Sequence, residues 1–176
     1  MTSGRPMPNA TAAKPATTST DRLRQLAVVG SEIACIVGTL VGIGRLGTRV
    51  EESSGGSLAA DATLIAPGRP AFAIWSVIYC GLAAYTIWQL LPAHAASPRA
   101  RAIGWLAAAS MLLNAAWLLV TQVGWLWVSV LVILGLTLVL GVLVQRLHEQ
   151  AAGGTMEKVV VDGTFGLYLG WVCVAT

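Results

Sequence analysis

The sequence predicts an all-α integral membrane protein, a transmembrane bundle of five helices whose fifth helix is incomplete. Three observations lead to this prediction. Of the 176 residues, 56% are hydrophobic and only 11% are charged, whereas soluble domains carry about 25% charged residues. The mean hydropathy is +0.72. The apolar residues also gather into five runs, and a bilayer core needs about 20 helical residues to be crossed.

Residues 1–25 are predicted to form a disordered tail, and residues 26–176 the transmembrane bundle. The tail begins MTSGRPMPNATAAKPATTST, which is rich in Thr, Ala and Pro and almost lacks bulky apolar side chains. Such a segment cannot bury enough surface to offset the entropy lost on ordering. A signal peptide is the alternative for the first apolar run, but that run is longer than a usual signal core and no clean cleavage site follows.

The five predicted spans are separated by short connections, apart from a long loop over residues 45–70. They cover residues 26–44, 71–91, 103–120, 125–145 and 164–176. The last run has only about 13 residues, too few to cross a bilayer. We therefore expect a fragment, or a natural end further on. A four-helix protein with a re-entrant tail is the alternative.

Lys and Arg predict the orientation of the bundle. The tail, the 92–102 loop and the 146–163 loop share one side and hold Arg5, Lys14, Arg22, Arg24, Arg99, Arg101, Arg146 and Lys158. The other side holds only Arg45, Arg49 and Arg69. This asymmetry predicts a cell-membrane protein with a cytoplasmic N-terminus. The net charge of +3 is modest and spread over loops, so it does not indicate a nucleic-acid partner.

The first run has small residues at every fourth position, a pattern typical of close helix packing in membranes. They are Gly30, Ala34, Gly38 and Gly42, and the fifth run repeats the spacing with Gly166 and Gly170. The pattern leaves open whether the partner helix belongs to the same chain or to a second copy in a homodimer.

Glu32 lies inside the first run, about 9 Å from its start at 1.5 Å per residue. An acid at that depth indicates a functional site. The alternative is that its carboxylate reaches back to the headgroups or pairs with Arg22 or Arg24.

Three later runs each combine an aromatic residue with a polar or aromatic neighbour one helical turn away. These are Trp75 with Tyr79, Asn114 with Trp117, and Tyr168 with Trp171, followed by Ala175 on the face of Trp171. Buried indole, phenol and amide groups need hydrogen-bond partners. Such faces suit a flat, mostly apolar ligand with a few polar edges. Aromatic core packing and an interhelical hydrogen bond are the alternatives.

The remaining tryptophans lie near predicted helix ends, where a membrane-interface belt explains them. They are Trp88, Trp105, Trp125 and Trp127, while the role of Tyr85 stays undecided.

Cys35, Cys80 and Cys173 lie in apolar runs without CxxC spacing, and we expect free, buried thiols rather than a disulfide or metal site. His94 and His148 have no further ligand at metal-binding spacing. No common catalytic motif occurs. The sequence therefore predicts neither an enzyme nor a required cofactor.

Together, IWSVIY, LLNAAW and LYLGWVCVAT resemble, in order and spacing, the TspO/MBR family, the tryptophan-rich sensory proteins that include the mitochondrial translocator protein. The resemblance covers residues 26–176. The family often has Pro-Pro-x-Trp before the second helix, where this chain reads APGRPAFAIW, and Leu167 replaces its usual Pro. These departures indicate a divergent branch.

The resemblance implies a five-helix bundle, often dimeric, that acts as a receptor or carrier for tetrapyrroles such as haem or protoporphyrin. Carried over by position, the ligand-binding residues are Trp75, Tyr79, Asn114, Trp117, Tyr168, Trp171 and Ala175. Two other functions stay open from the residues alone. One is a structural membrane protein assembled through its Gly ridges, and the other is a small transporter that uses Glu32.

Overall fold

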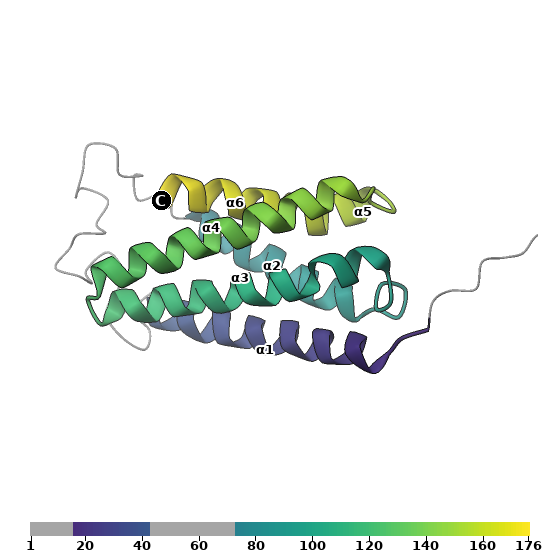
Figure 1. Ribbon diagram of the computed structural model, residues 1–176, viewed down its shortest axis with the longest axis horizontal. Helices are drawn as coiled ribbons and strands as arrows, with labels where there is room; N and C mark the ends of the chain where they lie inside the picture. Colours follow the sequence, from purple (N-terminus) through teal and green to yellow (C-terminus); the bar gives the residue numbers. More distant parts are fainter. Residues whose placement is uncertain (1–15, 43–72) are drawn as a thin grey trace, which may run out of the picture.

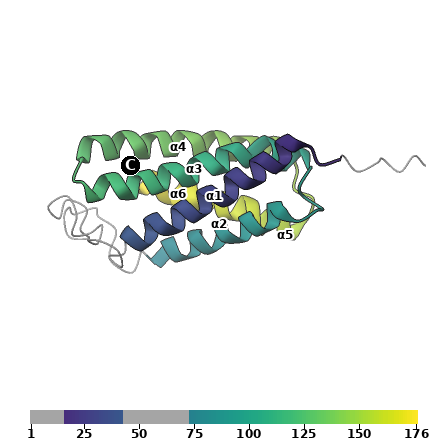
Figure 2. The ribbon, with the colours of Figure 1, turned by 90° about the horizontal axis from the view of Figure 1, so that it is seen from below.

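The computed structural model describes residues 16–42 and 73–176, and within these ranges the chain is an all-α bundle without strands, as predicted. The helices run along a common long axis (Figure 1). Helix α3 lies between α1 and α4 in both views (Figures 1 and 2), and its packing on these two helices is the most extensive in the bundle. Helices α2 and α6 pack on each other and complete the bundle.

Helix α1 (Ser19–Gly42) begins seven residues before the predicted span. Thr18 and Asp21 cap it reciprocally, because the Asp21 carboxylate accepts from Thr18 N at 3.0 Å and Thr18 Oγ1 accepts from Asp21 N at 3.2 Å. Such a capping box satisfies backbone donors that the first turn otherwise leaves free. The prediction of a disordered tail was therefore wrong for residues 19–25. Residues 1–15 lie outside the described part of the chain.

Helix α2 (Ile74–Leu90) and helix α3 (Pro98–Gln122) are joined by a short connection. Helix α3 begins five residues before its predicted span, because Ser97 Oγ accepts from Ala100 N at 3.1 Å and Pro98 occupies the first turn. Proline is favoured there, since its fixed φ suits a helix start and its missing N–H would have no intrahelical partner. A tight turn with Gly124 at φ 76° then leads into helix α4 (Leu126–Glu149).

The fifth helix is longer than predicted. It consists of α5 (Thr155–Glu157), the π-helical segment η4 (Lys158–Gly163) and α6 (Thr164–Ala175). Together these cover 21 residues, Thr155–Ala175, which is long and apolar enough to cross a membrane. The expectation that this span starts at 164 was therefore wrong, because charged residues near its start are accommodated within the helix.

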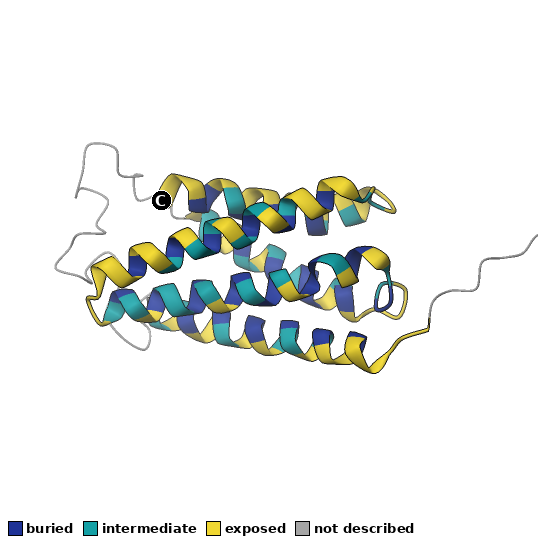
Figure 3. Cartoon of the chain, viewed as in Figure 1, coloured by how far each residue is buried: buried dark blue, intermediate teal, exposed yellow. Residues whose placement is uncertain are grey.

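Within residues 16–42 and 73–176, four helices are long and apolar enough to cross a membrane: α1, α3, α4 and the fifth helix, with α2 shorter at 17 residues. The exposed positions of α1 lie along the side that faces away from α3 (Figure 3). Leu131 and Leu138 of α4 are also largely exposed. Apolar side chains on the outside indicate contact with lipid, because water would make their exposure unfavourable.

The small residues of α1 do not form one continuous packing ridge within the chain. A Cβ on Gly38 would lie 3.2 Å from Ala115 Cα of α3, whereas Gly30 has open space around it. Gly166 and Gly170 of the fifth helix also have open space. A four-residue step turns an α-helix by about 40° beyond a full turn, so a ridge of several steps rotates away from its partner. Of Gly30, Gly38, Gly166 and Gly170, only Gly38 therefore makes the close helix contact that the sequence predicted.

Buried ion pairs join the helices at the end of the bundle where α1 begins. Asp21 pairs with Arg24 at 3.0 Å and with Arg101 of α3 at 2.6 Å. Arg24 also donates to the Ala95 carbonyl oxygen at 2.6 Å and is 2% exposed. These contacts explain why charged residues could be part of the helices rather than of loops, since buried charges are tolerated when paired.

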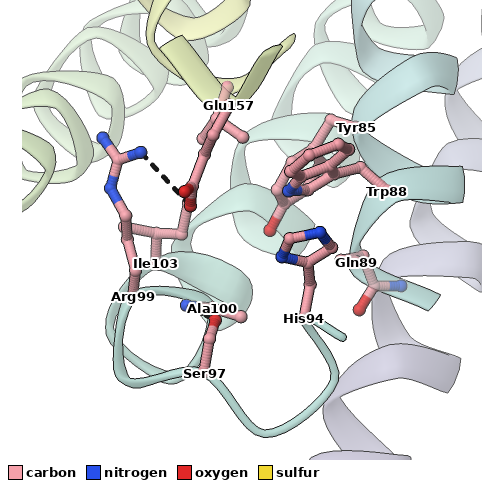
Figure 4. A pocket seen from close by; sticks show the side chains of 10 residues that line it. Tyr85, Trp88, Gln89, His94, Ser97, Arg99, Ala100, Ile103 and Glu157 are labelled. Carbon is pink, nitrogen blue, oxygen red and sulfur yellow. Dashed lines mark hydrogen bonds and ion pairs between the residues drawn. The ribbon is translucent and has the colours of Figure 1, made fainter. Parts of the chain in front are cut away.

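Arg99 makes the second group of ion pairs at this end. It binds Glu157 at 3.3 Å and also Asp162, both in the fifth helix. The two acids are five residues apart, a spacing that an α-helix would point about 140° apart. The wider π-helical turn of η4 brings both acids towards the same arginine. Figure 4 shows the Arg99–Glu157 pair at the edge of a small cavity also lined by Tyr85, Trp88 and His94.

Candidate functional site

Four aromatic side chains from two helices meet at the other end of the bundle. Trp75 of α2 stacks on Tyr79 one turn later, with ring centroids 5.4 Å apart. It also makes edge contacts with Tyr168 and Trp171 of α6, at centroid distances of 6.3 and 6.2 Å. These separations are typical of favourable aromatic pairs. We call these four residues the aromatic cluster.

Asn114 of α3 connects this cluster to α1. Its Nδ2 donates to Tyr79 Oη at 3.2 Å and to Cys35 Sγ at 3.3 Å. Asn114 is completely buried, and its Oδ1 accepts no hydrogen bond. One amide therefore ties α1, α2 and α3 together next to the aromatic rings, and it retains an unused acceptor.

Glu32 faces the interior of the bundle. It is only 5% exposed, and its carboxylate lies close enough to Cys35, Tyr79 and Tyr168 to interact electrostatically with each. Because α1 begins at Ser19, Glu32 lies 13 residues along it, or about 20 Å at 1.5 Å per residue. Glu32 therefore lies further from the start of its helix than the apolar run beginning at residue 26 implied.

The predicted pairing of Glu32 with a nearby arginine does not occur in the described structure. Arg24 instead binds Asp21 and the Ala95 carbonyl, and Arg22 is exposed. The carboxylate lies near the middle of α1 and is buried by its neighbours. The condition that a transporter hypothesis sets for Glu32, an inward orientation, is met.

The structure brings together five of the seven predicted site residues, namely Trp75, Tyr79, Asn114, Tyr168 and Trp171. Trp117 is half-buried against the same hydrophobic core. Ala175 is exposed and is the last residue of α6. Ala175 was predicted to share the face of Trp171, but it therefore lies on the outside of the bundle.

The rings of the aromatic cluster contact one another directly. Tyr168 is fully buried and Trp171 is 9% exposed, whereas Trp75 and Tyr79 are half-buried. The inner pair therefore fills the space between helices, and the outer pair keeps part of its ring surface accessible. The 45–70 loop lies outside the described residues.

Two cavities lie at the opposite end of the bundle, and none of the predicted site residues lines either of them. The cavity in Figure 4 has a volume of about 10 Å³, enough for about one water molecule. The other, of about 360 Å³, is lined by Arg99, His148, Lys158 and Asp162 among others. Both cavities are therefore separate from the aromatic cluster.

The aromatics outside the cluster divide into two groups. Trp105, Trp125 and Trp127 are exposed, up to 84% for Trp127, which suits an interface belt. Trp88 was also predicted for the belt, but it is half-buried and stacks on His94 with centroids 3.9 Å apart. Tyr85, left undecided above, is buried and packs edge-on against Phe165.

The cysteines differ from the prediction of uniformly buried thiols. All three are free, but only Cys35 is buried, whereas Cys80 and Cys173 are exposed. An apolar run in a membrane helix includes lipid-facing as well as inward positions, so hydropathy alone could not separate them. The sequence reasoning also missed Cys35 as a neighbour of the site. Its spacing of three from Glu32 places both on one helix face, which is the available signal.

Comparison with protein families gives one result. A family model described as TSPO-like protein matches residues 26–176. No curated protein and no solved structure matches the chain.

Proposed function

The chain belongs to the family of TSPO-like proteins and is an integral membrane protein of that type, and from this premise we propose that it binds a flat hydrophobic ligand of the tetrapyrrole class at the aromatic cluster. The observation that supports this most is the convergence of Trp75, Tyr79, Tyr168 and Trp171 with the amide of Asn114. Three helices thus contribute rings and a polar group to one place.

The physical basis of binding is the burial of the ligand's ring faces. Each Å² of apolar surface removed from water contributes about 25 cal/mol before ordering costs. The half-buried rings of Trp75 and Tyr79 offer the accessible surface, and Asn114 Oδ1 offers a hydrogen-bond acceptor. The protein would act as a receptor or carrier, by binding rather than by catalysis.

A titration of purified protein in non-ionic detergent with protoporphyrin IX tests this proposal, with Trp emission as the readout. We expect saturable quenching. Trp75→Phe and Trp171→Phe should each weaken the apparent affinity roughly three- to tenfold, the effect of one aromatic contact of about 1 kcal/mol. Trp127→Phe is the matched control, because Trp127 is 84% exposed on α4, and it should keep the wild-type affinity.

Unchanged affinity in both Trp75→Phe and Trp171→Phe would refute the proposed site. Absence of saturable quenching in the wild type would refute tetrapyrrole binding.

The direct ring-to-ring contacts favour a second candidate function, that of a structural membrane protein in which the aromatic cluster only packs the helices together. In that case both variants lower the melting temperature while the wild type binds no porphyrin.

A further inference from the structure

Glu32 is a buried acid without a basic partner in the described chain. Its side chain is 5% exposed, and its Oε2 accepts no hydrogen bond. The ion pairs of the described residues involve Asp21, Glu157 and Asp162 but not Glu32. An unpaired carboxylate near the middle of a membrane helix is unfavourable and marks a functional position.

A second acceptor near Glu32 is also unused. Asn114 is fully buried, its Nδ2 is already shared between Tyr79 Oη and Cys35 Sγ, and its Oδ1 has no donor. Glu32 lies within electrostatic reach of the same Cys35 and Tyr79. Two acceptors beside the cluster, Glu32 Oε2 and Asn114 Oδ1, are thus buried without a donor among the described residues, and buried acceptors left unpaired cost free energy.

The adjacent rings favour the same kind of ligand group. Trp75, Tyr79 and Trp171 pack together beside these acceptors. The faces of Trp and Tyr attract cations, and a group of such rings is a common way to recognise ammonium groups. A carboxylate supplies the compensating charge and a charge-assisted hydrogen bond.

We propose that the ligand of this site carries a basic nitrogen, whose N–H groups bind the Glu32 carboxylate and Asn114 Oδ1 while its flat apolar part contacts the aromatic cluster. This inference rests on the proposed function and adds to it that the flat ligand offers a basic nitrogen to Glu32. It assigns Glu32 the role of selecting charge, and the rings the role of binding apolar surface.

A matched pair of ligands tests the inference directly. 9-Aminoacridine is protonated at mildly alkaline pH, whereas acridine has the same ring system and is neutral there. Equilibrium dialysis against the purified protein in non-ionic micelles, with protein-free micelles as the blank, measures both affinities. We expect the wild type to prefer 9-aminoacridine roughly ten- to hundredfold, the range for hydrogen bonds to charged groups.

Glu32→Gln removes the charge and keeps the shape, so it should reduce this preference to about equal binding of the two ligands. Glu149→Gln is the control with the same chemical change, because Glu149 is exposed at the end of α4, and it should keep the preference. Circular dichroism checks that both variants retain the wild-type helix content. If Glu32→Gln does not fold, the affinities of the wild type for the two ligands still decide whether the site prefers a basic nitrogen.

The outcomes separate the two proposals. Equal wild-type affinity for the two acridines, or a preference that survives in Glu32→Gln, overturns the basic-nitrogen inference and leaves the aromatic site in place. Binding of protoporphyrin but of neither acridine has the same meaning. Failure to bind the acridines and protoporphyrin alike overturns the proposed function and this inference together.

Discussion

Substitution of Gly104 by Ala should destabilise the bundle by acting on a buried arginine. A Cβ at position 104 of α3 would overlap Arg24 Cδ and lie 2.8 Å from Arg24 Cγ. Arg24 cannot simply turn aside, because it pairs with Asp21 at 3.0 Å and donates to the Ala95 carbonyl at 2.6 Å. The methyl group therefore either separates α1 from α3 or breaks these contacts.

The magnitude follows from these two routes. Overpacking a close contact costs about 1–3 kcal/mol, and a lost hydrogen bond to a charged group costs about 1.5–3 kcal/mol. We expect the free energy of unfolding to fall by about 2–4 kcal/mol, because the bundle will combine helix separation and loss of the Arg24 contacts in the way that costs least. The matched control is Gly141→Ala of α4, where a Cβ meets nothing within 4 Å. There the change should be neutral, or stabilising by up to about 1 kcal/mol from helix propensity.

Denaturant titration in micelles, followed by circular dichroism, measures these free energies. A double-mutant cycle with Arg24→Ala isolates the mechanism, because the cost of Gly104→Ala should largely disappear once the arginine side chain is gone. If Gly104→Ala and Gly141→Ala behave alike, or if the cost persists unchanged in the Arg24→Ala background, the reasoning from the Arg24 contact is refuted.

Two further predictions concern the same end of the bundle. Arg99→Ala leaves Glu157 and Asp162 without their shared partner and should lower the free energy of unfolding by about 1–3 kcal/mol. Replacing both acids by their amides in this variant should restore part of the lost stability. If it restores none, the ion-pair explanation is contradicted. Thr18→Ala removes the hydroxyl that caps α1 and should lower the free energy of unfolding by about 1 kcal/mol. Thr18→Ser keeps the hydroxyl and should stay within a few tenths of a kcal/mol of the wild type. Equal effects of the two substitutions would argue against the cap.

The helices could be predicted from sequence because apolar runs of sufficient length are a local property. The largest errors lie where charged residues belong to the helices. Residues 19–25 and 155–163 looked too polar for a span, yet Asp21 and Arg24 pair with each other and Glu157 and Asp162 with Arg99. A charge partner on another helix is not visible in a hydropathy window, so the ends of the helices depended on tertiary contacts.

The candidate site was predictable only in part, because the sequence shows which residues share a face of one helix but not which helices meet. Spacings of three and four indicated that Trp75 shares a face with Tyr79 and that Tyr168 lies beside Trp171. They did not indicate that the α2 and α6 faces would meet, or that Ala175 would lie outside them. The depth and inward orientation of Glu32 likewise depended on where α1 begins and on its packing against α3.

The sequence by itself therefore determined that this chain is a membrane-embedded helical bundle and which side chains share a helix face, because composition and helical periodicity act over one or two turns. Only the tertiary structure decided which faces meet, which charges are paired and which acid is not. Those outcomes depend on the rotation and depth of each helix relative to its neighbours, and these are set by contacts between residues far apart in the chain, such as Asn114 with Cys35 and Tyr79.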